Sequence, residues 1–467
     1  MRSRLTQRFA PRSAALLVAL FLSRGALAAD CSRPTDESGA GGYAYGAAKV
    51  SSLGNARVLV WYTTEGEHAV NPASSRSDGV PDDVASALSV TTDALSGYAA
   101  QGYRAPLSDE LAPECGENGG DARFDVYLMN MRGADGMTVP ETGRCTSHAP
   151  EQCASYLVAK SNFADYYDTA EIGIRTVLPH ETFHAVQNAY DVELDRFWAE
   201  GTAQWATKVL YPELTDLERN LPAFFSQTSR SLEAQPSGVT AGFLYGSAIW
   251  PVFLSERFGS DVVRLVLEQE AIAGDPAIVA ADTVLQTLNS SIAQEYPLFS
   301  VWNSATGTRT GTGGYEHAAS YPLVSLVEVS RESTNGITSG LDSFFYHALV
   351  TAPAQLTLET DSSRNTALLV PFEDGLPRVD RVTPLPAQLE SEGIVVVSGI
   401  TTKKTDGPFT LSVTRPAPPS DGGCAVSNQR KPQRALALLF VPLALLGRRR
   451  VRARSARALR TAQSRRG

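Results

Sequence analysis

Two histidines four residues apart, with a glutamate directly after the first, constrain this chain more than any other feature. They lie in the stretch VLPHETFHAVQNAY and are His180 and His184, with Glu181 between them. Residues i and i+4 of an α-helix lie on one face, about 6 Å apart along the axis. Both imidazoles can therefore reach one metal ion, and Glu181 is placed to take a proton from water that the metal activates. The alternative is an ordinary helix that carries two histidines.

A third ligand is available further along the chain. Glu200 lies sixteen residues after His184, within FWAEGTAQWATKVL. A catalytic zinc site commonly has three protein ligands and leaves one position open for water. Small and bulky residues surround this glutamate in the sequence, namely Trp198, Gly201, Ala203 and Trp205. We expect the small residues to let the two helices approach closely, and the tryptophans to pack behind the site and exclude water.

These two motifs resemble a known family. HETFHAVQNAYD followed by FWAEGTAQWA is similar to the gluzincin metallopeptidases, and more closely to a family of surface metalloproteases from myxobacteria and their relatives. The segments WYTTEGEHAV, VPDDV, YGSAIWPVFLSERFG and VWNSATG fit the same family, so the likeness covers roughly 58–307. The resemblance implies the zinc ligands His180, His184 and Glu200, with Glu181 as general base and acid.

Three further residues carry expectations about this site. Gln204 stands where many gluzincins have an aspartate that orients a ligand histidine, and its amide oxygen can accept an imidazole N–H. Pro179 predicts that the first helix begins close to it, within 178–191, because proline is tolerated in a first turn. The oxyanion needs a hydrogen-bond donor. Tyr245 is the first candidate and Tyr190 the second, with a packing role as the alternative for each.

The N-terminal residues predict a secretory signal peptide over 1–28. Arginines come first, an apolar run follows from about Ala14 to Leu22, and Ala26-Leu27-Ala28 supplies a cleavage site. We therefore expect cleavage after Ala28. A buried N-terminal helix is the alternative.

The C-terminal residues 416–467 combine a Pro/Gly linker, Cys424, an apolar run over 435–447 and an arginine-rich end. The run is shorter than the roughly 20 residues of a membrane-spanning helix. The combination resembles the MYXO-CTERM sorting tail of myxobacterial surface proteins. It implies that a sorting enzyme acts near Cys424, that the protein is retained at the cell surface (outer membrane), and that only the tail meets the membrane. A basic nucleic-acid-binding tail is the alternative.

The charge distribution excludes a nucleic-acid partner for the rest of the chain. The formal net charge is −9, yet the predicted signal holds five arginines and the residues after Cys424 hold twelve basic side chains, with no acids in either segment. The part between them therefore carries a formal charge of −26. Such a surface repels nucleic acids and anionic membranes and favours solubility outside the cell.

Four cysteines precede the tail and predict disulfides in an exported protein. They are Cys31, Cys115, Cys145 and Cys153. Two disulfides allow three connectivities. One places Cys145 with Cys153 across a short loop and Cys31 with Cys115 near the N-terminus.

The residue pattern predicts an α+β fold with two folded domains. Strands are expected over 56–66 and 124–131, and a helix after Pro81. The pattern is mainly helical from about Glu171 to Gly307, with helices expected over 178–191, 199–210, 246–258 and 261–273. Short alternating strands from about Tyr321 predict an antiparallel β-sandwich. We therefore predict a gluzincin-like catalytic domain over 29–320 and a β-sandwich domain over 321–415.

The sequence as a whole predicts a secreted, cell-surface zinc endopeptidase that acts on protein or peptide substrates. A surface adhesin or carbohydrate-binding protein on an inactive metallopeptidase scaffold is one alternative, although an intact Glu181 argues against it. A zinc hydrolase of non-peptide substrates is the other. Calcium is a weaker expectation, through Asp78 and Asp82 of SDGVPDD, where a capped helix start is the alternative. The other histidines, His68, His148, His317 and His347, are isolated and expected to be structural.

Overall fold

The computed structural model describes residues 32–36, 39, 43–111, 119–147, 149–329 and 332–415. Contacts divide the chain into two units, Met1–Pro416 and Ala417–Gly467. The predicted signal peptide, the predicted Cys31–Cys115 pair and the sorting tail with Cys424 lie outside the described residues. The domain boundaries predicted within the first unit stay predictions.

A mixed five-stranded sheet forms the first part of the fold, in the order β1-β2-β3-β5-β4. The three central strands β2, β3 and β5 are parallel, and the edge strands β1 and β4 pair antiparallel with their neighbours. The strand bounds are β1 Ser51–Gly54, β2 Val58–Tyr62, β3 Phe124–Met129, β4 Gly136–Cys145 and β5 Cys153–Lys160.

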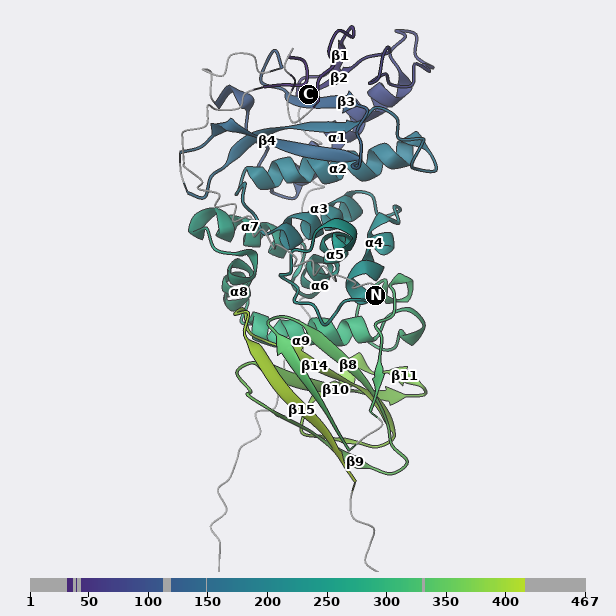
Figure 1. The fold of residues 1–467 in the computed structure, drawn as a ribbon, viewed down its shortest axis with the longest axis vertical. Coiled ribbons are helices and arrows are strands. Elements are labelled where there is room, and N and C mark those ends of the chain that lie inside the picture. The colour runs from purple at the N-terminus through teal and green to yellow at the C-terminus, as the bar shows by residue number, and fades with distance from the viewer. Residues whose placement is uncertain are drawn as a thin grey trace, which may run out of the picture. The chain divides into compact units, whose positions relative to one another are not determined.

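The two faces of this sheet bury different partners. On one face, Val126 and Leu128 of β3 join a core that α1 (Asp82–Ala100) and α2 (Ala170–Asn188) complete. Figure 1 shows these two helices running alongside the strands. On the other face, Tyr127 and Met129 pack with Tyr43, Tyr45 and Val50 of the segment that precedes β1. Alternate side chains of β3 therefore enter opposite cores, as the two-residue period of a strand requires.

Helices make up most of the next part of the chain. Their bounds are α3 Arg196–Leu210, α4 Asp216–Phe225, α5 Gly242–Gly246, α6 Ile249–Phe258, α7 Asp261–Ala273, α8 Ala277–Thr287 and α9 Ile292–Ser304. The helix predicted over 261–273 has those bounds, whereas the one predicted over 246–258 begins three residues later, as α6. The stretch Gly238–Phe258 is long and apolar enough to cross a membrane, but 61% of its apolar window is buried in the protein, as in a core helix.

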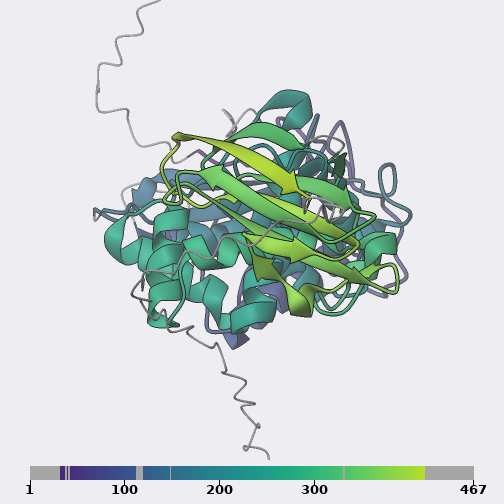
Figure 2. The ribbon, with the colours of Figure 1, turned by 90° about the horizontal axis from the view of Figure 1, so that it is seen from below.

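Two further sheets follow, and Figure 2 shows their strands layered in green and yellow. One has the order β11-β10-β14-β8-β6, with β12 beside β10, and the other has the order β13-β9-β15-β7. The longer strands are β7 Ser333–Ser339, β8 Ser343–Leu349, β9 Ala354–Thr360, β10 Asn365–Glu373, β14 Glu392–Gly399 and β15 Asp406–Thr414. The short ones are β6 Val327–Glu328, β11 Leu376–Pro377, β12 Thr383–Pro384 and β13 Ala387–Leu389. Their pairs are antiparallel except β6 with β8.

The first of these sheets is buried on both faces. Val395 and Val397 of β14 pack with Leu356 and Leu411 of the opposing sheet. Ile394 and Val396 join the core of the helical part, where α9 packs against β14. This double burial explains the uninterrupted apolar run IVVV, since a strand with one face in water would alternate. The predicted α+β fold with antiparallel sheets after the helical part is confirmed.

The loop predicted around 145–153 connects two strands of a long hairpin, which sequence patterning missed. β4 and β5 pair antiparallel, and a disulfide joins Cys145 to Cys153 across the hairpin end. Glycine, proline and glutamate within β4 concealed the strand from sequence patterning, because these residues are depleted in strands. The predicted Cys145–Cys153 disulfide is confirmed.

A buried acid in the helical core leads to a prediction about pH. Glu270 of α7 is 1% exposed and accepts a hydrogen bond from the indole N–H of Trp198 at 3.1 Å. Burial, together with the charges of Asp191 and Asp195, raises the pKa of Glu270 to about 9, although the indole bond lowers it. In the unfolded chain a glutamate has a pKa of about 4.3. Between these values the folded state holds a proton that the unfolded state releases, so the free energy of unfolding falls as pH rises.

We therefore expect Glu270→Gln to be more stable than the wild type at pH 8, and the difference to shrink toward pH 5. Urea midpoints at both pH values measure this. Glu268→Gln, on the same helix but paired with Arg264 at 2.6 Å, serves as the matched control. Equal pH dependence in wild type and Glu270→Gln would contradict the prediction.

Candidate metal centre

Helix α2 carries both histidines, and it begins at Ala170, nine residues before Pro179. Thr169 is the N-cap, and its side chain accepts a hydrogen bond from Ile172 N at 3.2 Å. Pro179 therefore lies inside the helix, and the prediction that the helix starts beside it was wrong. The carbonyl of Pro179 accepts the hydroxyl of the buried Tyr98 at 2.9 Å, so contact with α1 stabilises this part of α2.

The side chains of His180, His184 and Glu200 converge at the contact between α2 and α3. His180 Nε2 lies 3.2 Å from Glu200 Oε2 and 3.1 Å from His184 Nε2. His184 Nε2 lies 3.5 Å from the same carboxylate oxygen. The three atoms therefore form a nearly equilateral triangle, although the residues come from two helices and span 21 positions of the sequence.

This triangle fits a tetrahedral zinc ion. Zinc binds histidine nitrogen and carboxylate oxygen at about 2.0–2.2 Å, so two ligand atoms of a tetrahedron lie about 3.3–3.6 Å apart. The three measured separations differ from that range by about 0.2 Å at most. Separately, the ligand atoms of His180, Glu181 and His184 all lie within 4.8 Å of one another, so this group can hold a metal ion such as zinc.

Gln187, a residue not considered from the sequence, orients His184. Its Nε2 lies 2.9 Å from the carbonyl oxygen of Ala199 and 2.7 Å from the hydroxyl of Thr202, while its Oε1 lies 2.7 Å from His184 Nδ1. The Ala199 carbonyl can only accept a hydrogen bond, so the amide nitrogen must face α3 and the oxygen must face His184. His184 Nδ1 then carries a hydrogen, and His184 Nε2 is directed toward the other ligands.

Gln204 does not have the role expected of it. Its Nε2 donates to Asp216 Oδ2 at 2.7 Å, and Gln187 occupies the position beside the imidazole. The expectation came from counting four residues after the ligand glutamate. The available signal was instead an amide three residues after His184 on the same helix, since side chains at i and i+3 are neighbours.

The electrostatics of the cluster favour a positive charge among the three groups. Burial opposes protonation of His184, but its contacts with Glu200 and the charge of Glu181 outweigh this and raise the pKa of His184 to about 9. Burial alone would raise the pKa of Glu200, yet the hydrogen bonds and charges of His180 and His184 hold it well below its usual value. A divalent cation can replace the proton that this arrangement attracts.

Strand β4 positions the carboxylate of Glu181. The hydroxyl of Thr138 lies 2.9 Å from Glu181 Oε2 and 2.7 Å from the main-chain oxygen of the same residue. A Cβ on Gly136 would lie 2.7 Å from Glu181 Cγ and 2.5 Å from Val177 Cγ1. Only glycine therefore lets the strand come this close to α2.

A cavity of about 350 Å³ opens beside Glu181 and His180. Its walls come from several elements, namely Asp135 and Gly136 at the start of β4, Tyr167, Val177 of α2, Gln204 of α3, Asp216 and Asn220 of α4, and Tyr245 of α5. The ring of Tyr245 lies 5.8 Å from that of His180. Burial, and then the charges of Glu200 and Glu181, raise the pKa of Tyr245, so that its hydroxyl keeps the proton needed to donate a hydrogen bond.

Tyr190, the second candidate donor, lies elsewhere. It is fully buried in the helical core, its hydroxyl accepts a hydrogen bond from Arg104 N at 2.9 Å, and the Arg104 guanidinium stacks on its ring. The expected function of Gly201 also changes. A Cβ there would lie 2.7 Å from Ser247 Oγ, so the glycine lets α3 approach the α5–α6 junction and not α2. Trp198 and Trp205 are buried, as expected.

The other sequence candidates lie apart from this cluster. Asp82 accepts hydrogen bonds from Ser75, and Asp78 forms an ion pair with Arg76, so protein donors already contact both acids. His68 Nδ1 accepts the Asn130 N–H. The remaining histidines are His347, which contacts Glu328 and Glu392, His317, which lies beside a 3₁₀ turn, and His148, which is outside the described residues.

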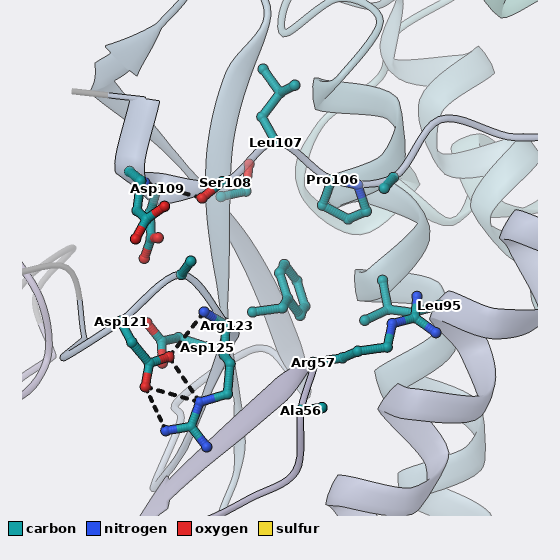
Figure 3. A pocket seen from close by; sticks show the side chains of 15 residues that line it. Ala56, Arg57, Leu95, Pro106, Leu107, Ser108, Asp109, Asp121, Arg123 and Asp125 are labelled. Carbon is teal, nitrogen blue, oxygen red and sulfur yellow. Dashed lines mark hydrogen bonds and ion pairs between the residues drawn. The ribbon is translucent and has the colours of Figure 1, made fainter. Parts of the chain in front are cut away.

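A larger cavity of about 560 Å³, shown in Figure 3, shares no residue with the histidine cluster. Its charged side chains are largely paired. Arg123 forms an ion pair with Asp121 at 2.7 Å, and Asp109 and Asp125 bind the buried guanidinium of Arg33 at 2.8 and 2.5 Å. We therefore place the candidate site at the smaller cavity, where the metal-ligating side chains lie.

The contacts of Gln187 predict a measurable effect on metal binding. Gln187→Met keeps the length of the side chain but removes the acceptor at His184 Nδ1. We expect the zinc affinity to fall about 10- to 100-fold, as is typical for loss of a residue that supports a ligand. Competition with a chromophoric chelator measures this. Thr202→Val removes one hydrogen-bond acceptor of the Gln187 amide and leaves the hydrogen bond between Gln187 and His184 intact. An equal loss of zinc affinity in Thr202→Val would therefore show that Gln187 acts only through packing.

No protein-family model matches the chain. No curated protein matches it either. Among solved structures, PliG from Salmonella Typhimurium, a periplasmic inhibitor of g-type lysozyme, is 12% identical with a TM-score of 0.16, over 19% of this chain and 97% of that one. Aeromonas hydrophila PliG is 15% identical, with the same TM-score, over 19% of this chain and 95% of that one.

A distant likeness extends over more of the chain. Aminopeptidase A of Legionella pneumophila, in complex with aspartic acid, is 11% identical with a TM-score of 0.34. The match covers 78% of this chain and 37% of the aminopeptidase, so the chain spans just over a third of that protein's length. At these scores the functional argument rests on the geometry of the site.

Proposed function

We propose that the protein is a zinc-dependent endopeptidase whose zinc ligands are His180, His184 and Glu200. The observation that carries the proposal is the ligand triangle, with separations of 3.1–3.5 Å, together with the carboxylate of Glu181 beside the same cavity. An ordinary surface helix would expose both histidines. Here His180 is 8% exposed and faces the half-buried carboxylate of Glu200.

The roles of the chain's own residues follow from their positions. The chemistry that a bound zinc ion supplies is polarisation of the scissile carbonyl and a lowered pKa for water. Glu181 takes the proton from the attacking water and passes it to the leaving amine. Thr138 holds the Glu181 carboxylate in place through its hydroxyl. Tyr245 is the proposed donor to the developing oxyanion, since it lines the same cavity and its hydroxyl keeps its proton.

An extended peptide is the substrate that the fold around the site suits. β4 is an edge strand of the mixed sheet, and its first residue, Gly136, lines the cavity beside Glu181. The outer edge of such a strand carries main-chain groups that can pair with a substrate backbone. This supports a peptide over a small ester or a carbohydrate.

The cellular setting is a further part of the proposal. It consists of export, processing near Cys424 and retention at the outer surface of the cell, and it rests on the signal-like first 28 residues and the tail pattern. The acidic charge of the intervening residues is consistent with an extracellular protein that has no nucleic-acid partner.

Metal content and peptide hydrolysis test the proposal together. The exported portion, residues 29–419, is analysed for zinc by plasma emission spectroscopy and assayed with casein, gelatin and a quenched peptide library, with and without chelator. One zinc per chain with chelator-sensitive cleavage is the expected result. Zinc without cleavage of any peptide would favour the adhesin or a non-peptide hydrolase. A folded protein that binds no zinc would overturn the proposal.

A further inference from the structure

We propose that Asp216 selects substrates with a positively charged side chain, lysine or arginine, in the cavity beside Glu181. The inference rests on the proposed peptidase function and adds the substrate class. Asp216 lines the same cavity as His180, Glu181 and Tyr245. It is therefore positioned to contact a substrate side chain.

Two neutral donors hold the Asp216 carboxylate without cancelling its charge. Gln204 Nε2 donates to Asp216 Oδ2 at 2.7 Å, and Asn220 Nδ2 donates to the same oxygen at 3.2 Å. Both amides also line the cavity. The orientation of the carboxylate is therefore set, and Oδ1 has no hydrogen-bond partner within the described part of the chain.

Asp135, the other acid on the cavity wall apart from Glu181, has a different environment. Lys160 Nζ lies 3.0 Å from Asp135 Oδ1, and the Tyr167 hydroxyl donates to Oδ2 at 2.8 Å. No lysine or arginine lines the cavity among the residues that the structure describes, and Asp216 has no ion pair there. Asp216 is also the first residue of α4, where the helix dipole favours a negative charge. The carboxylate can therefore pair with a cation that a substrate brings.

The remaining walls suit the long stem of a basic side chain. Tyr167, Val177 and Tyr245 contribute aromatic and aliphatic surface to the cavity. Lysine and arginine place their methylene groups along such surface while the charged end meets a polar partner. The charge of −26 between the predicted signal and Cys424 attracts cationic peptides over longer distances.

Paired substrates test the inference. Quenched peptides that differ only by lysine or glutamine at each position in turn are compared by kcat/KM. We expect kcat/KM to be about 10- to 100-fold higher for the lysine peptide than for the glutamine peptide at one position, because a hydrogen bond to a charged group contributes that much. Asp216→Asn keeps the shape of the side chain and an acceptor for the Gln204 amide. In this variant the values of kcat/KM for the two peptides should lie within about threefold of each other. Asp135→Asn, whose charge is already paired, should retain the wild-type preference.

A binding measurement separates this inference from the proposed function. Zinc-loaded Glu181→Gln, with and without Asp216→Asn, is titrated calorimetrically with the lysine and glutamine peptides. Tighter binding of the lysine peptide, lost with Asp216, supports the inference even without turnover. The inference is overturned if protein that retains Asp216 binds or cleaves both peptides equally. It is also overturned if the lysine preference persists in Asp216→Asn. Tighter binding of the lysine peptide without cleavage of any peptide would count against the peptidase function and not against the role of Asp216.

Discussion

Glu181→Gln is expected to lower kcat for peptide hydrolysis by about 10³-fold, within the range of 10²–10⁴ typical of a lost general acid–base group. The amide has the size of the carboxylate and can still accept the Thr138 hydroxyl, which lies 2.9 Å from Glu181 Oε2. The change therefore removes the proton acceptor while leaving the strand contact in place. Single-turnover cleavage of a quenched peptide by the zinc-loaded variant measures the effect.

Zinc content distinguishes this effect from loss of the metal site. Glu181 is not one of the three proposed ligands, so we expect Glu181→Gln to retain one zinc per chain. Glu171→Gln serves as the matched control, because Glu171 lies in the first turn of the same helix and pairs with Arg175 at 2.7 Å. Wild-type turnover in zinc-loaded Glu181→Gln would rule out the assigned role.

Glu200→Ala is expected to weaken zinc binding more than about 100-fold, which exceeds the 10- to 100-fold loss typical of a supporting residue. Glu200 Oε2 lies within 3.5 Å of both imidazole nitrogens, so its removal leaves two ligands on one helix and none on α3. Zinc stabilises the folded state in proportion to its affinity. The wild-type melting temperature should therefore fall on chelation, whereas that of the variant should change little.

Glu193→Ala is the matched control for this substitution. Glu193 is an exposed glutamate between α2 and α3, and its replacement removes the same charge without touching the cluster. It should bind zinc as the wild type does. Circular dichroism of the metal-free proteins shows whether Glu200→Ala still folds. A folded Glu200→Ala that binds zinc with wild-type affinity would exclude Glu200 as a ligand.

Several features could be predicted because their signals are local. The spacing of His180 and His184 places them on one helix face whatever surrounds the helix. The short separation of Cys145 and Cys153 suggested the disulfide that closes the β4–β5 hairpin. Apolar periodicity predicted α7 with its observed bounds. In each of these cases residues close in sequence determine the geometry, so the pattern is sufficient.

Features that depend on contacts between distant elements were missed or misassigned. Pro179 suggested a helix start, but packing against α1 and the cap at Thr169 place it inside α2. The glycine in β4 beside Glu181 is explained only by the approach of the strand to α2. Strand β4 itself is stabilised by pairing with β5, which outweighs its unfavourable composition.

Local residue patterns were sufficient to predict the α+β class, the pair of histidines on one helix face, the glutamate between them and a downstream carboxylate on a second helix. Tertiary packing was needed to show which oxygen and nitrogen atoms meet, that Gln187 and not Gln204 orients His184, and that Asp216 shares the cavity with Glu181. The difference arises because helical periodicity acts over a few residues. The 3.2 Å separation of His180 and Glu200 depends instead on how α2 and α3 pack.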